Sequence, residues 1–389
     1  MATVRDGSIE SPAPHSPVGT ELSDMKVTFI ISALFAGGAE RVISIMANYW
    51  ARKGWGVTIL SLDNGETPPF FEIDPAVCRM SLGLLGDSAG LIAGIRNNLK
   101  RVLMLRRAII RSQPHTVISF VDKTNVLTLF ATLGLKLEVM VSERTDPYQY
   151  SIGRIWGGLR WWVYSRADRI VVQTRGAQEY FLPKFQRRVT VIPNPVLPAS
   201  SNHATLNNRA TACMILAMGR LSKEKGFDDL LYAFRKVNDQ HPGCTLTIIG
   251  EGPERGELEL LRERLGLSGC VLLPGLVTTI EVFLRQASMF VLSSRFEGFP
   301  NALCEAMAYG LPVIATDCRS GPREIIRDGE DGLLVPPGDR DALATAMDSL
   351  MSDPERRARL GGRAMDITQR FGVEKVMGMW EKILEPIPQ

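Results

Sequence analysis

The chain contains two long stretches in which short apolar runs alternate with helical patterns, and the segment Pro193-Asn194-Pro195 separates them. Such alternation is typical of parallel sheets that carry helices on both faces. Prolines and small polar residues between two such stretches mark a domain boundary, and a length of 389 residues suits two domains. The sequence therefore predicts an α/β protein of two doubly wound domains, with a ligand cleft between them.

The expected strands are apolar runs, most of them close to a turn. In the first stretch they are Lys26–Ser32, Val57–Leu62, Thr116–Phe120, Val139–Ser142, Arg169–Thr174 and Val189–Ile192. In the second stretch they are Met214–Met218, Leu246–Ile249, Val271–Leu273, Met289–Ser293, Pro312–Thr316 and Leu333–Val335. The clearest helix is Ala39–Lys53, which Gly54 follows as a C-cap.

The chain divides into five segments. We expect a disordered tail (1–24), a first domain (25–195), a linker (196–210), a second domain (211–370) and a C-terminal helix that returns to the first domain (371–389). The tail lacks the charged start and apolar centre of a signal peptide, and no apolar run approaches the ~18 residues of a membrane-spanning helix. These features favour a cytoplasmic protein.

The charges are divided unevenly along the chain. Residues 1–200 contain 23 Lys/Arg and 16 Asp/Glu, a net charge of +7, whereas residues 201–389 contain 22 and 26, a net charge of −4. A basic first domain suits an anionic partner such as a membrane surface or phosphates, but this charge is too mild to indicate nucleic acid. The six cysteines show no metal-ligand spacing, so we expect small buried residues in a reducing compartment and no metal site.

The segment Ser293–Gly310 combines a strand end, a loop and the start of a helix. Pro300 suits the first helical turn, and Gly298 permits close approach of the backbone to a ligand. The free amides that begin at Asn301 form a helix N-terminus that favours a phosphate. Glu305 lies among apolar residues, so its carboxylate is expected to be paired or to bind ligand hydroxyls. Considered alone, Glu305 is equally well explained as an acid that favours the helix dipole.

Two further loops follow strands. Gly219–Gly226 carries Arg220 and Lys225, whose charges can pair with a diphosphate, although a solvated basic loop explains them equally well. Gly37–Arg41 contains two glycines that allow close approach to a phosphate or sugar, and the alternative is a tight turn with good caps. A near-match to the dinucleotide-binding fingerprint at Gly250–Arg255 is weak evidence for a dinucleotide.

Together these segments resemble retaining glycosyltransferases of the large two-domain class called GT-B, family 4. The matching stretches are Gly219–Phe227, Ile249–Glu254, Phe296–Pro312 and Gly332–Gly338. The signature is a pair of glutamates with seven residues between them, Glu297 and Glu305. The resemblance spans nearly the whole folded chain and implies two Rossmann-like domains that face each other across a cleft.

The resemblance implies a nucleotide-sugar substrate bound mainly by the second domain, with no cofactor and no metal. By resemblance, Arg220 and Lys225 neutralise the diphosphate, Glu297 contacts the transferred sugar, and Glu305 takes the ribose hydroxyls. The other residues implied in donor binding are Gly38, Glu254, Gly298, Phe299, Asn301, Ala302 and Leu303. These groups fit the chemistry, because cations and helix amides stabilise the charge that grows on the leaving diphosphate.

The first domain departs from the family pattern after Thr116–Phe120, where many members carry a histidine and this chain does not. Asp122 is the candidate for positioning the acceptor, and the leaving phosphate oxygen is an alternative proton acceptor. The segments Ser119–Asn125 and Ser142–Pro147 resemble the branch that extends polyprenyl-diphosphate-linked oligosaccharides in bacterial glycan assembly. This resemblance makes Glu143, in the second segment, a further acceptor-side candidate. Members of that branch often transfer N-acetylhexosamines such as N-acetylgalactosamine, which implies UDP as the nucleotide.

Two segments of the first domain combine apolar and basic residues at helical spacing. Arg154–Arg166 contains three tryptophans and a tyrosine within nine residues, and Arg96–Arg111 contains six basic residues. Tryptophan and tyrosine favour the lipid headgroup region, where each Lys or Arg adds roughly 1 kcal/mol on anionic lipid. Both segments also fit surface helices that pack on the sheet. We predict peripheral attachment of the first domain to the inner face of the plasma membrane.

Three other functions remain open. They are a hexosyl or mannosyl transferase of the same family with a soluble acceptor, a sugar-nucleotide epimerase, and an inactive partner of another transferase. The signature segments match transferases better than epimerases. Both glutamates of the signature are present, which speaks against an inactive relative.

Overall fold

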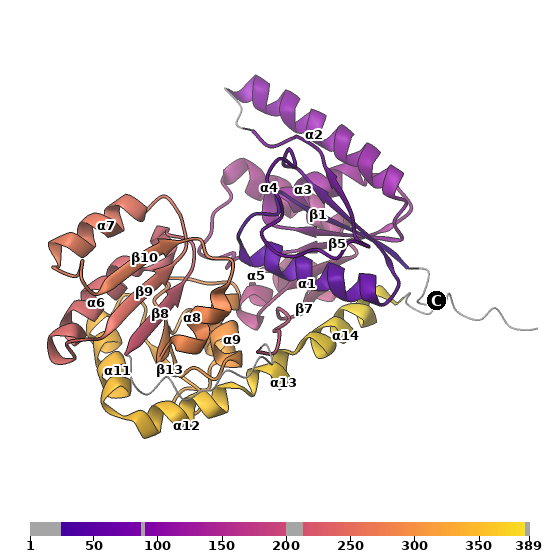
Figure 1. Ribbon diagram of the computed structural model, residues 1–389. Helices are drawn as coiled ribbons and strands as arrows, with labels where there is room; N and C mark the ends of the chain where they lie inside the picture. The colour runs from indigo at the N-terminus through magenta and orange to yellow at the C-terminus, as the bar shows by residue number, and fades with distance from the viewer. Residues whose placement is uncertain (1–24, 87–89, 200–212, 386–389) are drawn as a thin grey trace, which may run out of the picture.

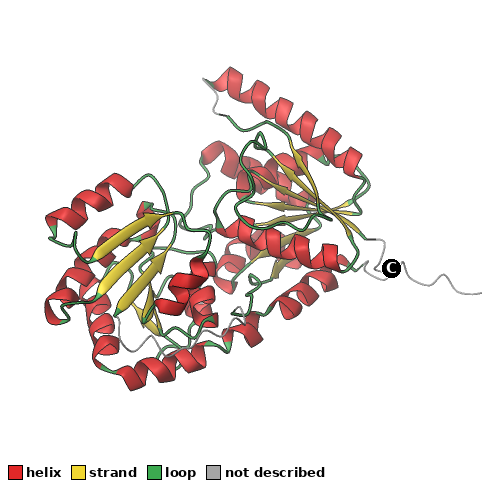
Figure 2. Ribbon diagram, in the orientation of Figure 1, coloured by secondary structure: helices red, strands yellow, loops and turns green. Residues whose placement is uncertain are grey.

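The computed structural model describes residues 25–86, 90–199 and 213–385. The predicted tail (1–24) and most of the predicted linker therefore lie outside the described residues. Two α/β domains lie side by side, and each has a parallel sheet with helices on both faces (Figures 1 and 2). This architecture confirms the predicted fold class.

Seven parallel strands form the sheet of the first domain, in the order β3-β2-β1-β4-β5-β6-β7. They are β1 (Lys26–Ile31), β2 (Gly56–Ser61), β3 (Cys78–Ser81), β4 (Thr116–Phe120), β5 (Glu138–Ser142), β6 (Arg169–Val172) and β7 (Val189–Val191). The helices are α1 (Gly38–Arg52), α2 (Leu91–Ser112), α3 (Asp122–Ala131), α4 (Arg154–Val163) and α5 (Arg175–Phe185). Strand β3 was not among the predicted strands, because this short edge strand is largely exposed and has no apolar run.

Six parallel strands form the second sheet, in the order β10-β9-β8-β11-β12-β13. They are β8 (Met214–Met218), β9 (Thr245–Ile249), β10 (Val271–Gly275), β11 (Met289–Leu292), β12 (Val313–Thr316) and β13 (Leu333–Val335). The helices are α6 (Phe227–Gln240), α7 (Arg255–Arg264), α8 (Ile280–Gln286), α9 (Asn301–Ala308), α10 (Pro322–Ile325), α11 (Arg340–Ser352), α12 (Pro354–Ala364) and α13 (Ile367–Phe371). All of the strands predicted for this half are present.

The last helix, α14 (Val373–Leu384), lies against the first domain after α12 and α13 have run along the edge of the molecule (Figure 1). Trp380 is buried in the same apolar core as Trp50 of α1. The indole nitrogen of Trp50 donates a hydrogen bond to Glu381, and the ammonium group of Lys53 pairs with the same carboxylate at 2.8 Å. The C-terminal helix α14 therefore packs against α1, through a shared apolar core and through contacts with the Glu381 carboxylate.

The order of strands reverses at one point in each sheet. In the first sheet this point lies between β1 and β4, and in the second between β8 and β11. Ligands of open α/β sheets bind in the crevice outside the carboxyl ends of strands at such a point. The segments that follow these four strands are the ones that contain Gly38, Asp122, Lys225 and Glu297. The topology therefore gathers motifs that are far apart in the sequence.

The expectation that all cysteines are separate buried residues is wrong. Cys213 and Cys244 form a disulfide bond, and Cys78 is exposed. Met214 lies opposite Thr245 in the pairing of β8 with β9, so the two cysteines that precede them are neighbours. The two cysteines are 31 residues apart in the sequence. The disulfide bond could not be predicted, because nothing in the sequence indicates that the strands β8 and β9 are neighbours.

Candidate functional site

The segments after β8 and β11 meet at an ion pair between Lys225 and Glu297. The Lys225 Nζ and Glu297 Oε1 atoms are 2.6 Å apart, and the hydroxyl of Ser294 donates to the same oxygen at 2.6 Å. Gly226 makes this approach possible: its φ is +60°, and a Cβ atom there would lie 2.3 Å from the carbonyl oxygen of Ser293. Two motifs that are separate in the sequence thus form one charged cluster.

Helix α9 begins beside this cluster, directly after Pro300. The side chains of Phe299 and Leu303 are buried in the apolar core of the second domain, so only their backbone groups can serve a ligand. Gly298 lies against the first domain, because a Cβ atom there would be 2.5 Å from the carbonyl oxygen of Arg144. The proposed phosphate-binding end of α9 therefore lies at the contact between the domains. Ala302 is half-buried in the first turn.

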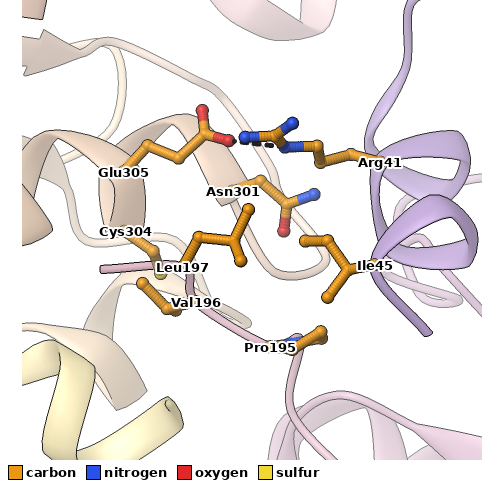
Figure 3. Close-up of a pocket in the computed structure, with 8 residues that line it drawn as sticks. All are labelled: Arg41, Ile45, Pro195, Val196, Leu197, Asn301, Cys304 and Glu305. Atoms are coloured by element: carbon orange, nitrogen blue, oxygen red, sulfur yellow. Dashed lines mark hydrogen bonds and ion pairs between the residues drawn. The ribbon is translucent and has the colours of Figure 1, made fainter. Parts of the chain in front are cut away.

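A second ion pair joins the two domains. Nε of Arg41, on α1, lies 3.0 Å from Oε1 of Glu305, on α9 (Figure 3). Burial raises the pKa of Glu305, and the guanidinium of Arg41 opposes that rise. The amide of Asn301 donates to the carbonyl oxygen of Gly38 at 3.0 Å, so two predicted donor-binding residues from different domains are in direct contact.

A chain of hydrogen bonds at the domain boundary links Arg144, Asn194 and Asn301. No role was predicted for Arg144 or Asn194 from the sequence. Arg144 Nη1 donates to Asn194 Oδ1 at 2.6 Å, and the Asn194 amide donates to Asn301 Oδ1 at 2.7 Å. The Arg144 guanidinium lies 4.1 Å from the ring centroid of Phe120, and burial lowers its pKa to about 9. Asn194 stands between two prolines, and that pattern indicated only a boundary.

The remaining donor-side residues are less closely joined to the cluster. Arg220 is exposed, and in the part of the chain that the structure describes its guanidinium has no carboxylate partner. Glu254 is half-buried, and its amide bonds to the carbonyl oxygen of Leu221 at 2.9 Å. Burial raises the pKa of Tyr150, and the charges of both Asp122 and Arg220 also act on this phenol. Tyr150, which had no predicted role, therefore lies near groups of both domains.

These features agree with the comparisons to protein families. Residues 200–366 match the family model "Glycosyl transferases group 1", and residues 37–195 match the model "Glycosyl transferase 4-like domain". The chain belongs to the group 1 glycosyl transferases.

Individual relatives of this glycosyltransferase span nearly its whole length. It is 28% identical to an α-1,4-N-acetyl-D-galactosaminyltransferase of Campylobacter jejuni that acts on an undecaprenol-linked glycan. The aligned 364 residues cover 93% of this chain and 99% of the relative. Among solved structures, sucrose-phosphate synthase from Thermosynechococcus elongatus has a TM-score of 0.80 at 20% identity, covering 92% of this chain and 98% of that one. Anabaena HepE in complex with UDP and glucose has a TM-score of 0.77 at 18% identity, covering 93% and 100%. Both structures share the two-domain fold.

The predicted acceptor-side residues of the glycosyltransferase are buried in its first domain. Asp122 begins α3 with its carboxylate accepting a hydrogen bond from the Lys123 amide at 2.6 Å, and burial raises its pKa. The preceding residue, Val121, has a φ of +73°, a strained conformation for a β-branched side chain. This strain marks the end of β4 as a place where the backbone is held in an unusual path.

Glu143 points into the interior of the first domain. Its carboxylate accepts a hydrogen bond from the Tyr164 hydroxyl and lies 3.8 Å from Arg160. Burial is the largest influence on its pKa, which is raised to about 7. Any effect of Glu143 on an acceptor therefore passes through its neighbours.

No metal site is evident in the described part of the glycosyltransferase. Among residues 25–86, 90–199 and 213–385, no group of three or more His, Cys, Asp or Glu side chains could hold a metal ion. The aspartates Asp339 and Asp341 lie at the start of α11, where the Asp339 carboxylate accepts hydrogen bonds from two helix amides. Asp339 therefore serves as the helix cap, and the Asp341 carboxylate pairs with Lys236.

The two segments predicted to face a membrane differ in exposure. Arg160 on α4 and Tyr164, which follows α4 directly, are buried, so the expectation that they lie on an exposed face is wrong. Trp161 stacks on Phe185, and of the three tryptophans only Trp162 is exposed. This segment packs on its own domain because its aromatic residues meet those of α5.

Helix α2 has the more exposed apolar surface. Four of its side chains are 49–71% exposed, namely Ile95, Leu99, Leu103 and Ile110. Four basic side chains of this helix are also exposed, namely Arg96, Lys100, Arg107 and Arg111. Among the described residues, no helix is long and apolar enough to cross a membrane.

Proposed function

We propose that this protein is a retaining glycosyltransferase that moves an N-acetylhexosamine from a UDP-sugar onto a polyprenyl-diphosphate-linked glycan. The observation that carries the donor half of the proposal is the Lys225–Glu297 pair beside the N-terminus of α9. A cation and a helix N-terminus at one place form a site for a diphosphate, and the glutamate beside them suits the hydroxyls of a sugar.

In this proposal the second domain stabilises the leaving group. Lys225 and Arg220 neutralise the diphosphate, with the amides at the start of α9 as further donors. Glu297 contacts the transferred sugar, Glu305 takes the ribose hydroxyls, and Glu254 lies near the base. As the anomeric bond breaks, negative charge grows on the diphosphate, and prearranged cations and amides stabilise it more in the transition state than in the ground state. This chemistry needs no metal ion and no cofactor.

The first domain positions the acceptor in this proposal. Asp122 lies at the carboxyl end of β4, beside the point where the strand order reverses. Its carboxylate orients the attacking hydroxyl, and the proton passes to the leaving phosphate oxygen on the same face of the sugar. Attack from that face keeps the anomeric configuration of the donor.

The choice of donor and acceptor is supported by similarity. The Campylobacter jejuni relative transfers N-acetyl-D-galactosamine to an undecaprenol-linked glycan, and the Anabaena structure contains UDP. The exposed apolar and basic side chains of α2 support an anionic membrane surface as the partner that presents such an acceptor. We place the protein at the cytoplasmic face of that membrane.

A panel of UDP-, GDP- and ADP-sugars with a short-chain polyprenyl-diphosphate glycan tests the proposal. Mass spectrometry reports whether one sugar has been added, and NMR of the product reports whether the anomeric configuration is kept. Addition of one N-acetylhexosamine from UDP with retention is the expected result. Transfer only to a soluble sugar would overturn the lipid-linked acceptor, whereas conversion of the donor to its epimer without transfer would make the protein an epimerase.

A further inference from the structure

Glu305, the residue proposed to bind the ribose, already forms an ion pair with Arg41 of the other domain. Arg41 and Glu305 point toward each other from α1 and α9 (Figure 3), and their side chains are 23% and 18% exposed. The Arg41 guanidinium also lies 5.0 Å from the ring centroid of Phe71, in its own domain. This second contact helps to hold the guanidinium toward the cleft.

The space beside this pair is too small for a ribose. The cavity is lined by Arg41, Ile45, Pro195, Val196, Leu197, Asn301, Cys304 and Glu305. Its volume is about 10 Å³, on the order of one water molecule. Part of its wall is α1, so a nucleoside cannot reach Glu305 through this cavity while α1 stays in place.

The start of α9 is covered by the same part of the first domain. The Asn301 side chain donates to the Gly38 carbonyl, and a Cβ atom on Gly38 would lie 3.4 Å from that amide nitrogen. The diphosphate proposed to bind here therefore competes for the same surface as the first residue of α1. Both contacts of this zone have to open together.

A second zone of contact between the domains lies apart from this cavity. The Glu324 carboxylate accepts hydrogen bonds from the amides of Arg175 and Gly176 at 2.9 and 3.1 Å, and the hydroxyls of Thr174 and Ser320 are 2.6 Å apart. None of these residues lines the cavity. The contact of α5 with α10 is thus separate from the contact of α1 with α9 that borders the cavity.

We propose that Arg41 is a positioning residue that latches the ligand-free cleft. It holds the Glu305 carboxylate, and it has to release that carboxylate before a nucleotide can bind. This inference rests on the proposed role of Glu305. Because the apparent dissociation constant is the intrinsic constant divided by the open fraction, removal of the latch tightens nucleotide binding by about five-fold, as expected for a partly exposed ion pair.

The test compares the full chain with Arg41→Ala, Arg41→Lys and Arg52→Ala. UDP binding is measured by calorimetry, and the radius of gyration of the ligand-free protein by small-angle X-ray scattering. We expect Arg41→Ala to bind UDP more tightly and to be more extended. Arg41→Lys keeps the ion pair and should resemble the parent. Arg52→Ala removes an arginine from the exposed end of the same helix, 74% exposed, and should also resemble the parent.

The outcomes separate the latch from the function on which it rests. Unchanged or weaker UDP binding by Arg41→Ala overturns the latch, because Arg41 then does not compete with the nucleotide. If none of the proteins binds UDP, the proposed donor nucleotide is wrong. The scattering measurement then decides the latch by itself, and an unchanged radius of gyration in Arg41→Ala overturns it.

Discussion

The two sides of the cleft are built in different ways. On the second domain, Lys225 and Ser294 come from two short motifs and both bond directly to Glu297, and of these three residues Lys225 is partly exposed whereas the other two are buried. On the first domain, Asp122 and Glu143 are buried among residues from several helices. The donor side is thus a compact cluster that can bind an anion, whereas the acceptor side consists of carboxyl groups buried within the first domain. Changes on the donor side should affect transfer to every acceptor, and changes on the acceptor side should depend on the acceptor.

The largest effects should follow removal of the two signature glutamates. We expect Glu297→Ala and Glu305→Ala each to lower kcat by about a thousand-fold or more, because each loses contacts to the reacting donor. The melting temperature should change little. Glu263→Ala, at an exposed position on α7, is the control with the same change in charge. Near-normal turnover in either variant would show that these glutamates do not form the donor site. The comparison between the donor side and the acceptor side would then fail as well.

Lys225→Ala should lower kcat by about a hundred-fold, with a smaller change in the donor dissociation constant. The reason is that its charge acts on a charge that grows in the transition state. The control is Lys223→Ala, an exposed lysine in the same loop. Steady-state rates at saturating donor measure the effect. Equal losses in binding and in turnover would assign Lys225 to ground-state binding alone.

The same contrast explains what the sequence could predict. The second-domain motifs are local, so the sequence could single out Lys225 and the start of α9 as candidates, and the family resemblance added the role of Glu297. The structure shows that Lys225 and Glu297 are in contact. The bonds of Arg41 to Glu305 and of Asn194 to Asn301 join residues more than a hundred positions apart. Their formation depends on how the domains meet, and a single sequence carries no signal of that.

Exposure was the other limit of sequence reasoning. The apolar and basic pattern of α4 and α2 is similar, but only the structure shows that α5 covers Trp161 of α4 and Tyr164, which follows that helix. The aromatic content of a helix therefore did not indicate its environment, because aromatic residues pack on one another inside domains as readily as they face lipid.

A change on the acceptor side should be selective. We expect Asp122→Asn to lower kcat/KM for the lipid-linked acceptor by about ten-fold, since an amide orients the acceptor hydroxyl less well than a carboxylate. UDP binding should stay at the parent value, because the Asp122 carboxylate bonds to Lys123 of its own domain and has no part in the proposed donor site. Calorimetry with UDP and initial rates with varied acceptor check both statements. A parallel loss of UDP binding would show that the two sides of the cleft do not act separately.

The membrane-facing role of α2 should give a smaller effect. Lys100→Gln removes one exposed charge from α2 and should weaken binding to vesicles with anionic lipid by about five-fold, as expected for ~1 kcal/mol per basic residue. Arg359→Gln, exposed on α12 of the second domain, is the matched control. Co-sedimentation at low and high salt measures the difference. Equal weakening by both variants would show that the attraction is not specific to α2.

The smallest expected effect is the pH dependence of stability that Glu143 contributes. Burial raises the pKa of this carboxyl from its ordinary value of 4.5 to about 7. The folded protein therefore holds the proton where the unfolded chain has lost it, and the stabilisation is fully present below pH 4.5 and is lost as the pH rises through about 7. The charged or titratable neighbours that act on Glu143 are Arg160, Tyr164 and Asp122.

Glu143→Gln cannot lose this proton, so its stability should lack this part of the pH dependence. We expect the melting temperature of Glu143→Gln, relative to the parent, to rise between pH 5 and pH 8 by a few degrees. The sign holds even if the variant is less stable at both pH values, because the amide changes the surroundings of the buried Arg160 equally at both. A melting-temperature difference that stays constant over this range would show that Glu143 already titrates normally. Burial would then not govern the charge of Glu143, and the description of the acceptor side as a set of buried carboxyl groups would be lost.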